Sequence, residues 1–294
     1  MRVLITGVNG FIGSHIAQYF IENSIEIVGW DLNVTTTQNN RQVDILKDNI
    51  KIILEKDIPD IVIHCAGYAD VGYSLKNPLL DYAGNTTSVY RLLEAIRQLK
   101  MTKTKFLFLS SAAVYGQPNR LPIKEDDPLH PMSPYAMHKK FAEEICKYYT
   151  KYYGLQCKIA RIFSAYGVGL KKQIFWDMCQ KIKSTQRLEM FGTGDESRDF
   201  IYIEDLVQAL YLIATDDSSE TIYNVANGKE ITIKNCATEF GRCMGINEIE
   251  FNKKTREGDP KNWCADITRL KKLGYSPRVS LVEGIERYVN WCMS

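Results

Sequence analysis

The sequence carries almost no excess charge of either sign. It has 37 lysines and arginines against 35 aspartates and glutamates, so the formal net charge at pH 7 is only +2. A strongly basic face that would hold a nucleic acid is therefore not predicted. Runs of five like charges and low-complexity tracts are absent, and 45% of the residues are hydrophobic, which excludes a disordered chain.

Cysteines and histidines with the spacing of a metal site are absent from the chain. Its eight cysteines include no C-x-x-C, and the four histidines (His15, His64, His130 and His138) form no paired ligand motif. We therefore expect scattered reduced thiols and no metal.

Long apolar runs are also missing. No apolar stretch reaches the roughly 18–20 residues that a membrane span needs. The sequence starts directly with strand-like residues 2–6 and shows no signal peptide. We expect a cytoplasmic protein with neither a membrane nor a nucleic acid as partner.

The first half of the chain alternates short apolar runs with longer amphipathic stretches. This rhythm is typical of βαβ units around a parallel sheet that is covered on both faces. It predicts the α/β class with a Rossmann-type, doubly wound parallel sheet. Strands are predicted at 3–6, 26–30, 60–64, 105–109 and 158–161. Helices are predicted at 13–22, 77–100, 134–153, 204–214, 233–243 and 281–292.

A glycine-rich turn follows the first predicted strand. Gly7, Gly10 and Gly13 have G-x-x-G-x-x-G spacing and lead into a helix, with Phe11 and Ile12 before the last glycine. Glycine allows a sharp turn and a close approach to a pyrophosphate, which the helix N-terminus attracts. The segment predicts dinucleotide binding; a purely structural turn is the alternative.

The second predicted strand ends at Asp31, 18 residues beyond Gly13. A carboxylate there accepts hydrogen bonds from the adenosine ribose and repels the 2′-phosphate of NADP, so NAD is the expected cofactor. Alternatively, Asp31 only begins a polar loop. Asp44 and Ile45 are further candidates on the adenine side of this site.

Tyr135 and Lys139 lie four residues apart near the start of a predicted helix, which places them on one face. Ser133 as N-cap and Pro134 at the first helical position mark where that helix begins. A phenol has a pKa near 10, so a base near pH 7 needs about 4 kcal/mol of preferential phenolate stabilisation. Lys139 and an oxidised nicotinamide are suitable sources, although such pairs on helices are more often structural.

Ser111 follows the fourth predicted strand, at the carboxyl end of the sheet where ligands of such folds bind. Its hydroxyl is placed to hydrogen-bond a reacting oxygen. The alternative is that it only caps the strand end.

Together these residues resemble the extended short-chain dehydrogenase/reductase family of nucleotide-sugar epimerases, dehydratases and reductases. The resemblance spans nearly the whole chain and rests on Gly7, Gly10, Gly13, Ser111, Tyr135 and Lys139. Residues 64–74 resemble the segment after the third Rossmann strand in UDP-galactose 4-epimerases. Residues 191–194, 198–205 and 256–260 match the family's nucleotide-sugar segments.

The resemblance implies further site residues. Cys65, Ala66, Gly67 and Asn85 would join the cofactor-binding residues. It also implies an NAD-binding Rossmann domain at 1–165, with a return of the chain at about 195–225. Residues 166–294 would then form a smaller, nucleotide-sugar-binding α/β domain.

For the substrate, the resemblance implies contacts from Ser111, Tyr135, Ser164, Arg198 and Arg256. The two arginines would bind the diphosphate, which suits the bidentate geometry of a guanidinium group.

Three positions depart from the family pattern. Ala112 and Ala113 stand where dehydratases carry an Asp-Glu pair, which disfavours elimination of water. Ala69 replaces a lysine of the galactose epimerases, and Ser164 replaces an asparagine that contacts the substrate. The sugar is therefore not identified by the resemblance.

The resemblance implies an NAD-dependent nucleotide-sugar 4-epimerase that oxidises carbon 4 to a 4-keto intermediate, with a UDP-sugar favoured. The first alternative is an NAD(P)H-dependent reductase of a 4-keto-6-deoxy nucleotide sugar. A less favoured one is a non-catalytic regulator that senses a dinucleotide. A homodimer is implied as well, through a four-helix bundle formed by residues 77–100 and 134–153 of two copies.

Overall fold

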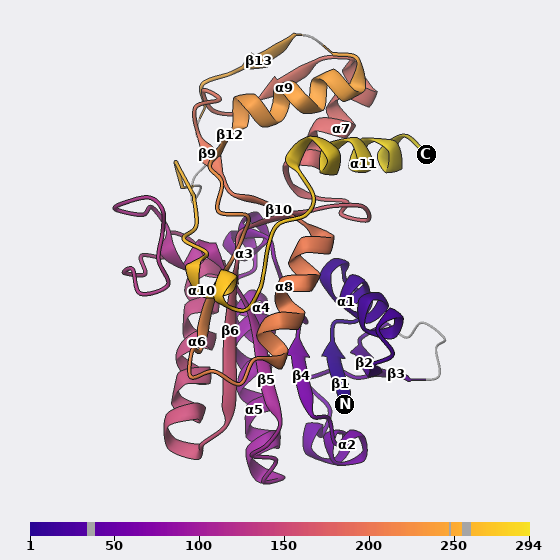
Figure 1. Cartoon of the computed structure of the whole chain (residues 1–294), viewed down its shortest axis with the longest axis vertical. Helices are drawn as coiled ribbons and strands as arrows, with labels where there is room; N and C mark the ends of the chain where they lie inside the picture. The colour runs from indigo at the N-terminus through magenta and orange to yellow at the C-terminus, as the bar shows by residue number, and fades with distance from the viewer. Residues whose placement is uncertain (34–38, 247, 255–259) are drawn as a thin grey trace.

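The computed structural model describes residues 1–33, 39–246, 248–254 and 260–294. Its centre is a seven-stranded sheet with every neighbouring pair parallel, which confirms the predicted α/β class (Figure 1). In spatial order the strands are β11 (Ile222–Val225), β6 (Gln156–Ile162), β5 (Lys105–Ser111), β4 (Ile61–His64), β1 (Arg2–Thr6), β2 (Glu26–Asp31) and β3 (Asn40–Gln42).

Both faces of the sheet are buried, because alternate residues of each strand enter two separate apolar cores. In β1, Val3 and Ile5 belong to one core and Leu4 to the other. In β5, Leu107 and Leu109 join the first core, whereas Phe106 packs in the second. The alternation follows from the two-residue repeat of a strand. It explains why these strands read as continuous apolar runs.

Helices cover the two faces. On one face, α1 (Phe11–Glu22) contacts α8 (Ile203–Thr215), and α8 also contacts β5 and β6. The other face is covered by α2 (Ile50–Asp57), α5 (Ser88–Gln98) and α6 (Pro134–Tyr153), with α5 packed between the other two. The predicted bounds of α6 are confirmed, including the Ser133 cap and Pro134 in the first turn.

The helix predicted at 77–100 is interrupted. The structure has α4 (Pro78–Tyr82), a π-helical turn η1 (Ala83–Thr87) and then α5. A short helix that the sequence did not predict, α3 (Val71–Lys76), precedes them. Single π-turns inside helices frequently mark functional sites.

The second half of the chain forms a smaller layer beyond the carboxyl ends of the central strands, at the top of Figure 1. Among the described residues, three two-stranded sheets and three helices of 12 or 13 residues build most of it. Its elements are β7 (Ser164–Tyr166), α7 (Gln173–Thr185), β8 (Leu188–Met190), β9 (Ser197–Arg198), β10 (Phe200–Tyr202), β12 (Ile231–Thr232), α9 (Ile233–Met244), β13 (Ile249–Phe251) and α11 (Leu281–Met293). The short helix α10 (Thr268–Lys272) lies lower, where it contacts β11 of the central sheet. A short 3-10 turn, η2 (Ala112–Tyr115), lies at the end of β5.

The sequence predicted α8, α9 and α11 but neither α2 nor α7. The sequence also did not predict the strands of two or three residues, because such segments are too short to show the two-residue alternation of a strand. The chain does come back to the central sheet in the second half, since β11 pairs with β6. The division into domains at residues 165 and 166 remains a prediction. Across the described residues, no helix is both long and apolar enough to cross a membrane.

A buried ion pair joins α6 to the central sheet. The Arg161 guanidinium on β6 donates two hydrogen bonds to Glu143 on α6, at 3.0 and 2.7 Å. Arg161 is 1% exposed and Glu143 is fully buried. Ser110 donates a third hydrogen bond to Glu143 at 2.6 Å, and Arg161 also donates to the hydroxyl of Tyr115 at 2.9 Å. The Glu143 carboxylate therefore keeps its hydrogen bonds only while α6, β5 and β6 hold their positions relative to one another.

We predict that Arg161→Met destabilises the fold by about 3–5 kcal/mol, because it leaves the Glu143 carboxylate buried without its partner. The free energy of unfolding in urea measures the effect. Arg287→Met is the matched control, since Arg287 pairs with Glu204 at the surface at 2.9 Å. That variant should lose less than about 1 kcal/mol. Equal losses in the two variants would contradict a special role of the buried pair.

Candidate active site

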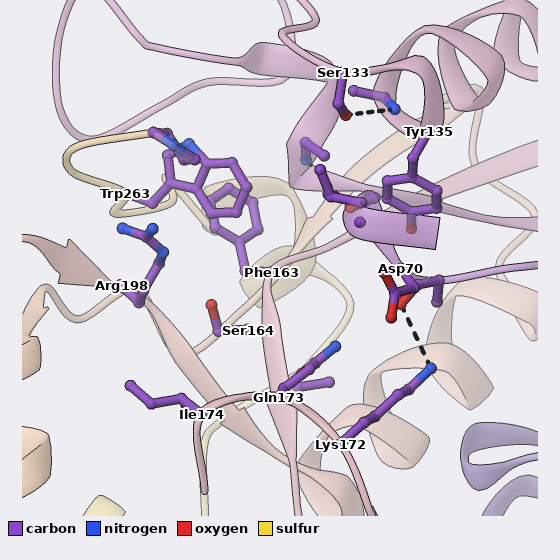
Figure 2. Close-up of a pocket in the computed structure, with 18 of the residues that line it drawn as sticks. Asp70, Ser133, Tyr135, Phe163, Ser164, Lys172, Gln173, Ile174, Arg198 and Trp263 are labelled. Carbon is purple, nitrogen blue, oxygen red and sulfur yellow. Dashed lines mark hydrogen bonds between the residues drawn. The ribbon is translucent and has the colours of Figure 1, made fainter. Parts of the chain in front are cut away.

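A large cavity separates the carboxyl ends of the central strands from the second half of the chain. Its volume is about 1350 Å³. The structure brings residues predicted from distant parts of the sequence to its wall: Ile12, Cys65, Gly67, Ser111, Tyr135, Lys139, Ser164 and Arg198. Figure 2 shows part of this wall.

The glycine turn packs too tightly for any side chain. Gly7 has φ +70°, and a Cβ there would lie 2.8 Å from the backbone nitrogen of Ala66. A Cβ on Gly13 would lie 2.1 Å from the carbonyl oxygen of Gly7. Gly10 is the N-cap of α1 and offers no side-chain cap, so Phe11 begins a helix whose first N–H groups are left for a ligand.

Asp31 lies beside this turn at the end of β2. Its carboxylate accepts from the backbone N–H of Asn9 at 3.0 Å and of Asn33 at 3.2 Å. Asp44 lies beyond β3, where it accepts from the N–H of Leu46. Ile45, next to it, is buried in the second core. These three predicted residues are outside the lining of the large cavity.

Behind the cavity wall lies an unsatisfied acceptor. Asn85 of the π-turn is fully buried, and its Oδ1 has no hydrogen-bond partner among the described residues. A Cβ on Gly67 would come within 2.7 Å of that oxygen, so the oxygen faces Gly67. Ala66 packs on the other side of this loop, where its N–H donates to Thr6 at 3.3 Å. A buried acceptor of this kind favours a ligand that can donate to it.

Tyr135 and Lys139 occupy the cavity side of α6. The Tyr135 hydroxyl points into the pocket (Figure 2), and Ser111 lies on the same cavity wall. The Lys139 ammonium donates to the carbonyl of Leu109 at 3.0 Å and lies 5.9 Å from the centre of the Tyr135 ring. Ser111 also caps η2, accepting from the N–H of Ala113 at 3.2 Å. The predicted pair and the predicted serine are thus brought together.

Burial shifts both groups toward their neutral forms. Desolvation raises the pKa of Tyr135 to about 12, although the hydrogen bond from Ser111 opposes the shift. Desolvation lowers the pKa of Lys139 to about 8, and the negative charge of Asp81 opposes it. The phenol is therefore protonated near neutral pH in the protein alone. Additional positive charge in the cavity would be needed to make Tyr135 a base.

Two further predicted residues lie toward the opposite end of the pocket from Tyr135 (Figure 2). The Arg198 guanidinium lies 5.5 Å from the centre of the Trp263 ring and donates to the carbonyl of Ser197 at 2.8 Å. Ser164 lies between Arg198 and Tyr135 in this view. Arg256, the other predicted diphosphate contact, lies outside the described residues.

The sequence did not single out Trp263, Lys172 or Gln173, which also line the cavity. Trp263 donates from its indole nitrogen to the carbonyl of Gly116 at 3.0 Å, a contact across 147 residues of chain that no local pattern predicts. Lys172 and Gln173 stand at the start of the unpredicted helix α7. Desolvation lowers the pKa of Lys172, whose ammonium approaches the carbonyl of Ala69 at 3.5 Å.

Comparisons with known proteins agree with this geometry. Residues 3–226 match the model of the NAD dependent epimerase/dehydratase family. A putative UDP-glucose 4-epimerase of Methanocaldococcus jannaschii is 35% identical, over 98% of this chain and 97% of its own. A UDP-glucuronate 4-epimerase of Thermodesulfobacterium geofontis is 30% identical, over 98% and 95%.

Solved structures of similar proteins share the whole fold. The UDP-glucose 4-epimerase of Thermotoga maritima, crystallised with UDP-glucose, has a TM-score of 0.90 at 27% identity, covering 99% of this chain and 98% of that one. The UDP-glucuronic acid 4-epimerase of Bacillus cereus, in complex with UDP-glucuronic acid and NAD, gives the same score and identity, covering 100% and 99%. The chain therefore belongs to the NAD-dependent epimerase/dehydratase family, and NAD is its cofactor.

Proposed function

We propose that this protein is a nucleotide-sugar 4-epimerase that works through a 4-keto intermediate. The observation that carries the proposal is the meeting of Tyr135, Ser111 and Lys139 on the wall of one cavity of about 1350 Å³. A buried phenol, a hydroxyl and an ammonium group that lie close together can transfer a proton to and from a substrate oxygen. Relatives that share the fold and nearly the whole chain are named as UDP-sugar 4-epimerases, which supports this reaction.

The residues present fit NAD. Gly7, Gly10 and Gly13 allow the tight turn that leads into the N-terminus of α1, a site that suits a pyrophosphate, and Asn85 offers a buried acceptor behind Gly67. We assign the adenosine ribose to Asp31, whose carboxylate disfavours the 2′-phosphate of NADP. When bound, NAD supplies a hydride acceptor that takes the hydride from carbon 4 and returns it.

Within this proposal, Tyr135 removes the proton of the sugar 4-hydroxyl and later gives it back. Ser111 orients that oxygen, and general acid-base help of this kind contributes roughly 10²- to 10⁴-fold in rate. The Lys139 ammonium favours the phenolate form of Tyr135 by its charge. Epimerisation then requires that the 4-keto sugar turns its other face to the same residues before reduction.

We assign the diphosphate of the substrate to the end of the pocket that holds Arg198. The Arg198 guanidinium lies 5.5 Å from the centre of the Trp263 ring and brings a permanent positive charge to this end of the pocket, which suits the oxygens of a diphosphate. Ser164 lies between this end and Tyr135 in Figure 2, on the side where a sugar would lie. We also expect Arg256 to contact the diphosphate, on the resemblance alone. The names of the relatives favour a UDP-sugar.

We also propose a homodimer through α4, α5 and α6. The helices expose a set of large apolar side chains, and those of α6 recur at helical spacing as a stripe. The set comprises Leu79, Leu80, Tyr90, Phe141, Tyr148 and Tyr152. A four-helix bundle formed by two copies would cover them.

We predict that Tyr135→Phe abolishes turnover while the variant still folds and binds NAD. The reason is that phenylalanine keeps the ring but has no hydroxyl to move the proton. The assay incubates the protein with UDP-, GDP-, CDP- and dTDP-sugars, with and without NADH, and identifies the products by chromatography. Epimers formed without added NADH support the proposal. A product that appears only with a stoichiometric supply of NADH identifies the reductase alternative instead, and full turnover by the variant would exclude the assigned base.

We predict that the ionisation of Tyr135 depends on the cofactor. Its pKa is about 12 in the protein alone, so the tyrosine stays protonated up to about pH 10. A positively charged nicotinamide favours phenolate and brings the pKa down. Ultraviolet difference titration of the wild type against Tyr135→Phe cancels the other tyrosines. The difference should show a tyrosinate at lower pH with NAD⁺ than without, and identical curves in both states would refute the idea.

We predict a mass near twice 33.7 kDa for the wild type by light scattering. Phe141→Glu places a charge in the exposed apolar stripe of α6 and should shift the mass toward a single chain. Glu22→Lys is a matched control, because Glu22 is exposed at the end of α1, on the opposite face of the sheet from these helices. A wild type with the mass of one chain would count against the dimer.

A further inference from the structure

A buried acid and a buried histidine meet directly behind Tyr135 and Lys139. The ring Nδ1 of His138, on α6, lies 2.6 Å from Oδ2 of Asp81, on α4. Asp81 is fully buried and His138 is nearly so. The proposed proton transfers do not use either group. Burying such a pair costs folding free energy unless hydrogen bonds compensate for the lost hydration, so we ask what these hydrogen bonds hold in place.

The second oxygen of Asp81 sets the orientation of Asn85. The amide nitrogen of Asn85 donates to Oδ1 of Asp81 at 3.1 Å. An ionised carboxylate only accepts hydrogen bonds, so it selects the NH₂ end of the Asn85 amide and turns the carbonyl oxygen away. That oxygen is the buried acceptor that faces Gly67 and lacks a partner among the described residues.

His138 in turn holds Asp81 and the π-turn in place. Because the carboxylate can only accept, the imidazole donates from Nδ1. The edge of the His138 ring packs against Tyr82, with the ring centres 5.3 Å apart. The carbonyl oxygen of His138 accepts from the hydroxyl of Thr86, the residue after Asn85, at 2.9 Å. The helix α4 and the π-turn are thereby both tied to the helix that carries Tyr135 and Lys139.

We propose that Asp81 and His138 are positioning residues for the cofactor. They fix the Asn85 carboxamide so that its oxygen stands at Gly67 and accepts a hydrogen bond from an N–H or O–H group of NAD. The proposal rests on NAD binding and holds whichever sugar the protein converts. Its test therefore measures cofactor affinity in the absence of any sugar.

The experiment titrates NAD into the cofactor-depleted full chain by calorimetry. His138→Leu removes the donor to Asp81. Asp81→Asn replaces one of the two acceptor oxygens with an NH₂ donor, so Asn85 and the Nδ1–H of His138 no longer both find an acceptor. Each should weaken NAD binding by about ten-fold or more, the size expected when one buried hydrogen bond is lost. His138→Gln keeps a side-chain N–H and should recover most of the affinity. Asp81→Asn preserves the shape of the side chain, so it decides the matter even where His138→Leu does not fold.

Tyr149→Phe is the matched control. The Tyr149 hydroxyl donates to Glu94 at 2.9 Å and also joins α5 to α6, but neither residue lines the cavity. Its loss should lower the melting temperature and leave NAD affinity unchanged. If His138→Leu and Asp81→Asn lower only the melting temperature, or if Tyr149→Phe weakens NAD equally, the pair is merely structural and the proposal fails.

A double variant tests the route of the effect. In an Asn85→Ala background, His138→Leu should cause no further loss of NAD affinity, because the group that it positions is already gone. Additive losses would mean that His138 does not act through Asn85. Failure of the epimerase assignment would show instead as normal NAD binding without conversion of any nucleotide sugar.

Discussion

The site depends on the buried pair of Arg161 and Glu143. Tyr135, Lys139 and Glu143 follow one another at intervals of four residues, so they share a face of α6. Glu143 is anchored to β6 through Arg161 and to β5 through Ser110, the residue before Ser111. One carboxylate thus fixes the distance between the helix that carries the phenol and the strand end that carries the serine. Their positions relative to each other are set by an ion pair that takes no part in the chemistry.

The sequence predicted the parts of the site that depend on local patterns. Glycine spacing, strand alternation and the Ser133 cap each act over a few residues, and the structure places Gly7, α6 and the central strands as those patterns indicate. The remainder depends on contacts between distant segments. Nothing near His138 in the sequence points to Asp81, 57 residues earlier, because their pairing requires the interrupted helix α4–η1–α5 to pack on α6. Cavity residues such as Trp263 are likewise assembled only by folding.

Without the cofactor, burial shifts Tyr135 and Lys139 toward their uncharged forms. Burial raises the pKa of Tyr135 to about 12 and lowers that of Lys139 to about 8, because a low-dielectric surrounding penalises either charge. A positive nicotinamide in the cavity would favour the phenolate form of Tyr135 instead. A tyrosine that becomes a base only beside the oxidised cofactor would leave the sugar untouched when the cofactor is absent.

The groups that surround Ser111 also limit the chemistry. Elimination of water from a sugar needs an acid and a base beyond the phenol, yet the next two residues are alanines, of which Ala112 is fully buried and Ala113 lines the cavity. Asp70, another cavity residue, is engaged as the cap of α3, accepting from the N–H of Tyr73 at 2.7 Å. Glu196 accepts from the backbone of Gly194 at 2.9 Å in the second half of the chain. Our proposal therefore assigns proton transfer at the sugar to Tyr135 and Ser111, and the two alanines after Ser111 offer no carboxylate beside it for a dehydration.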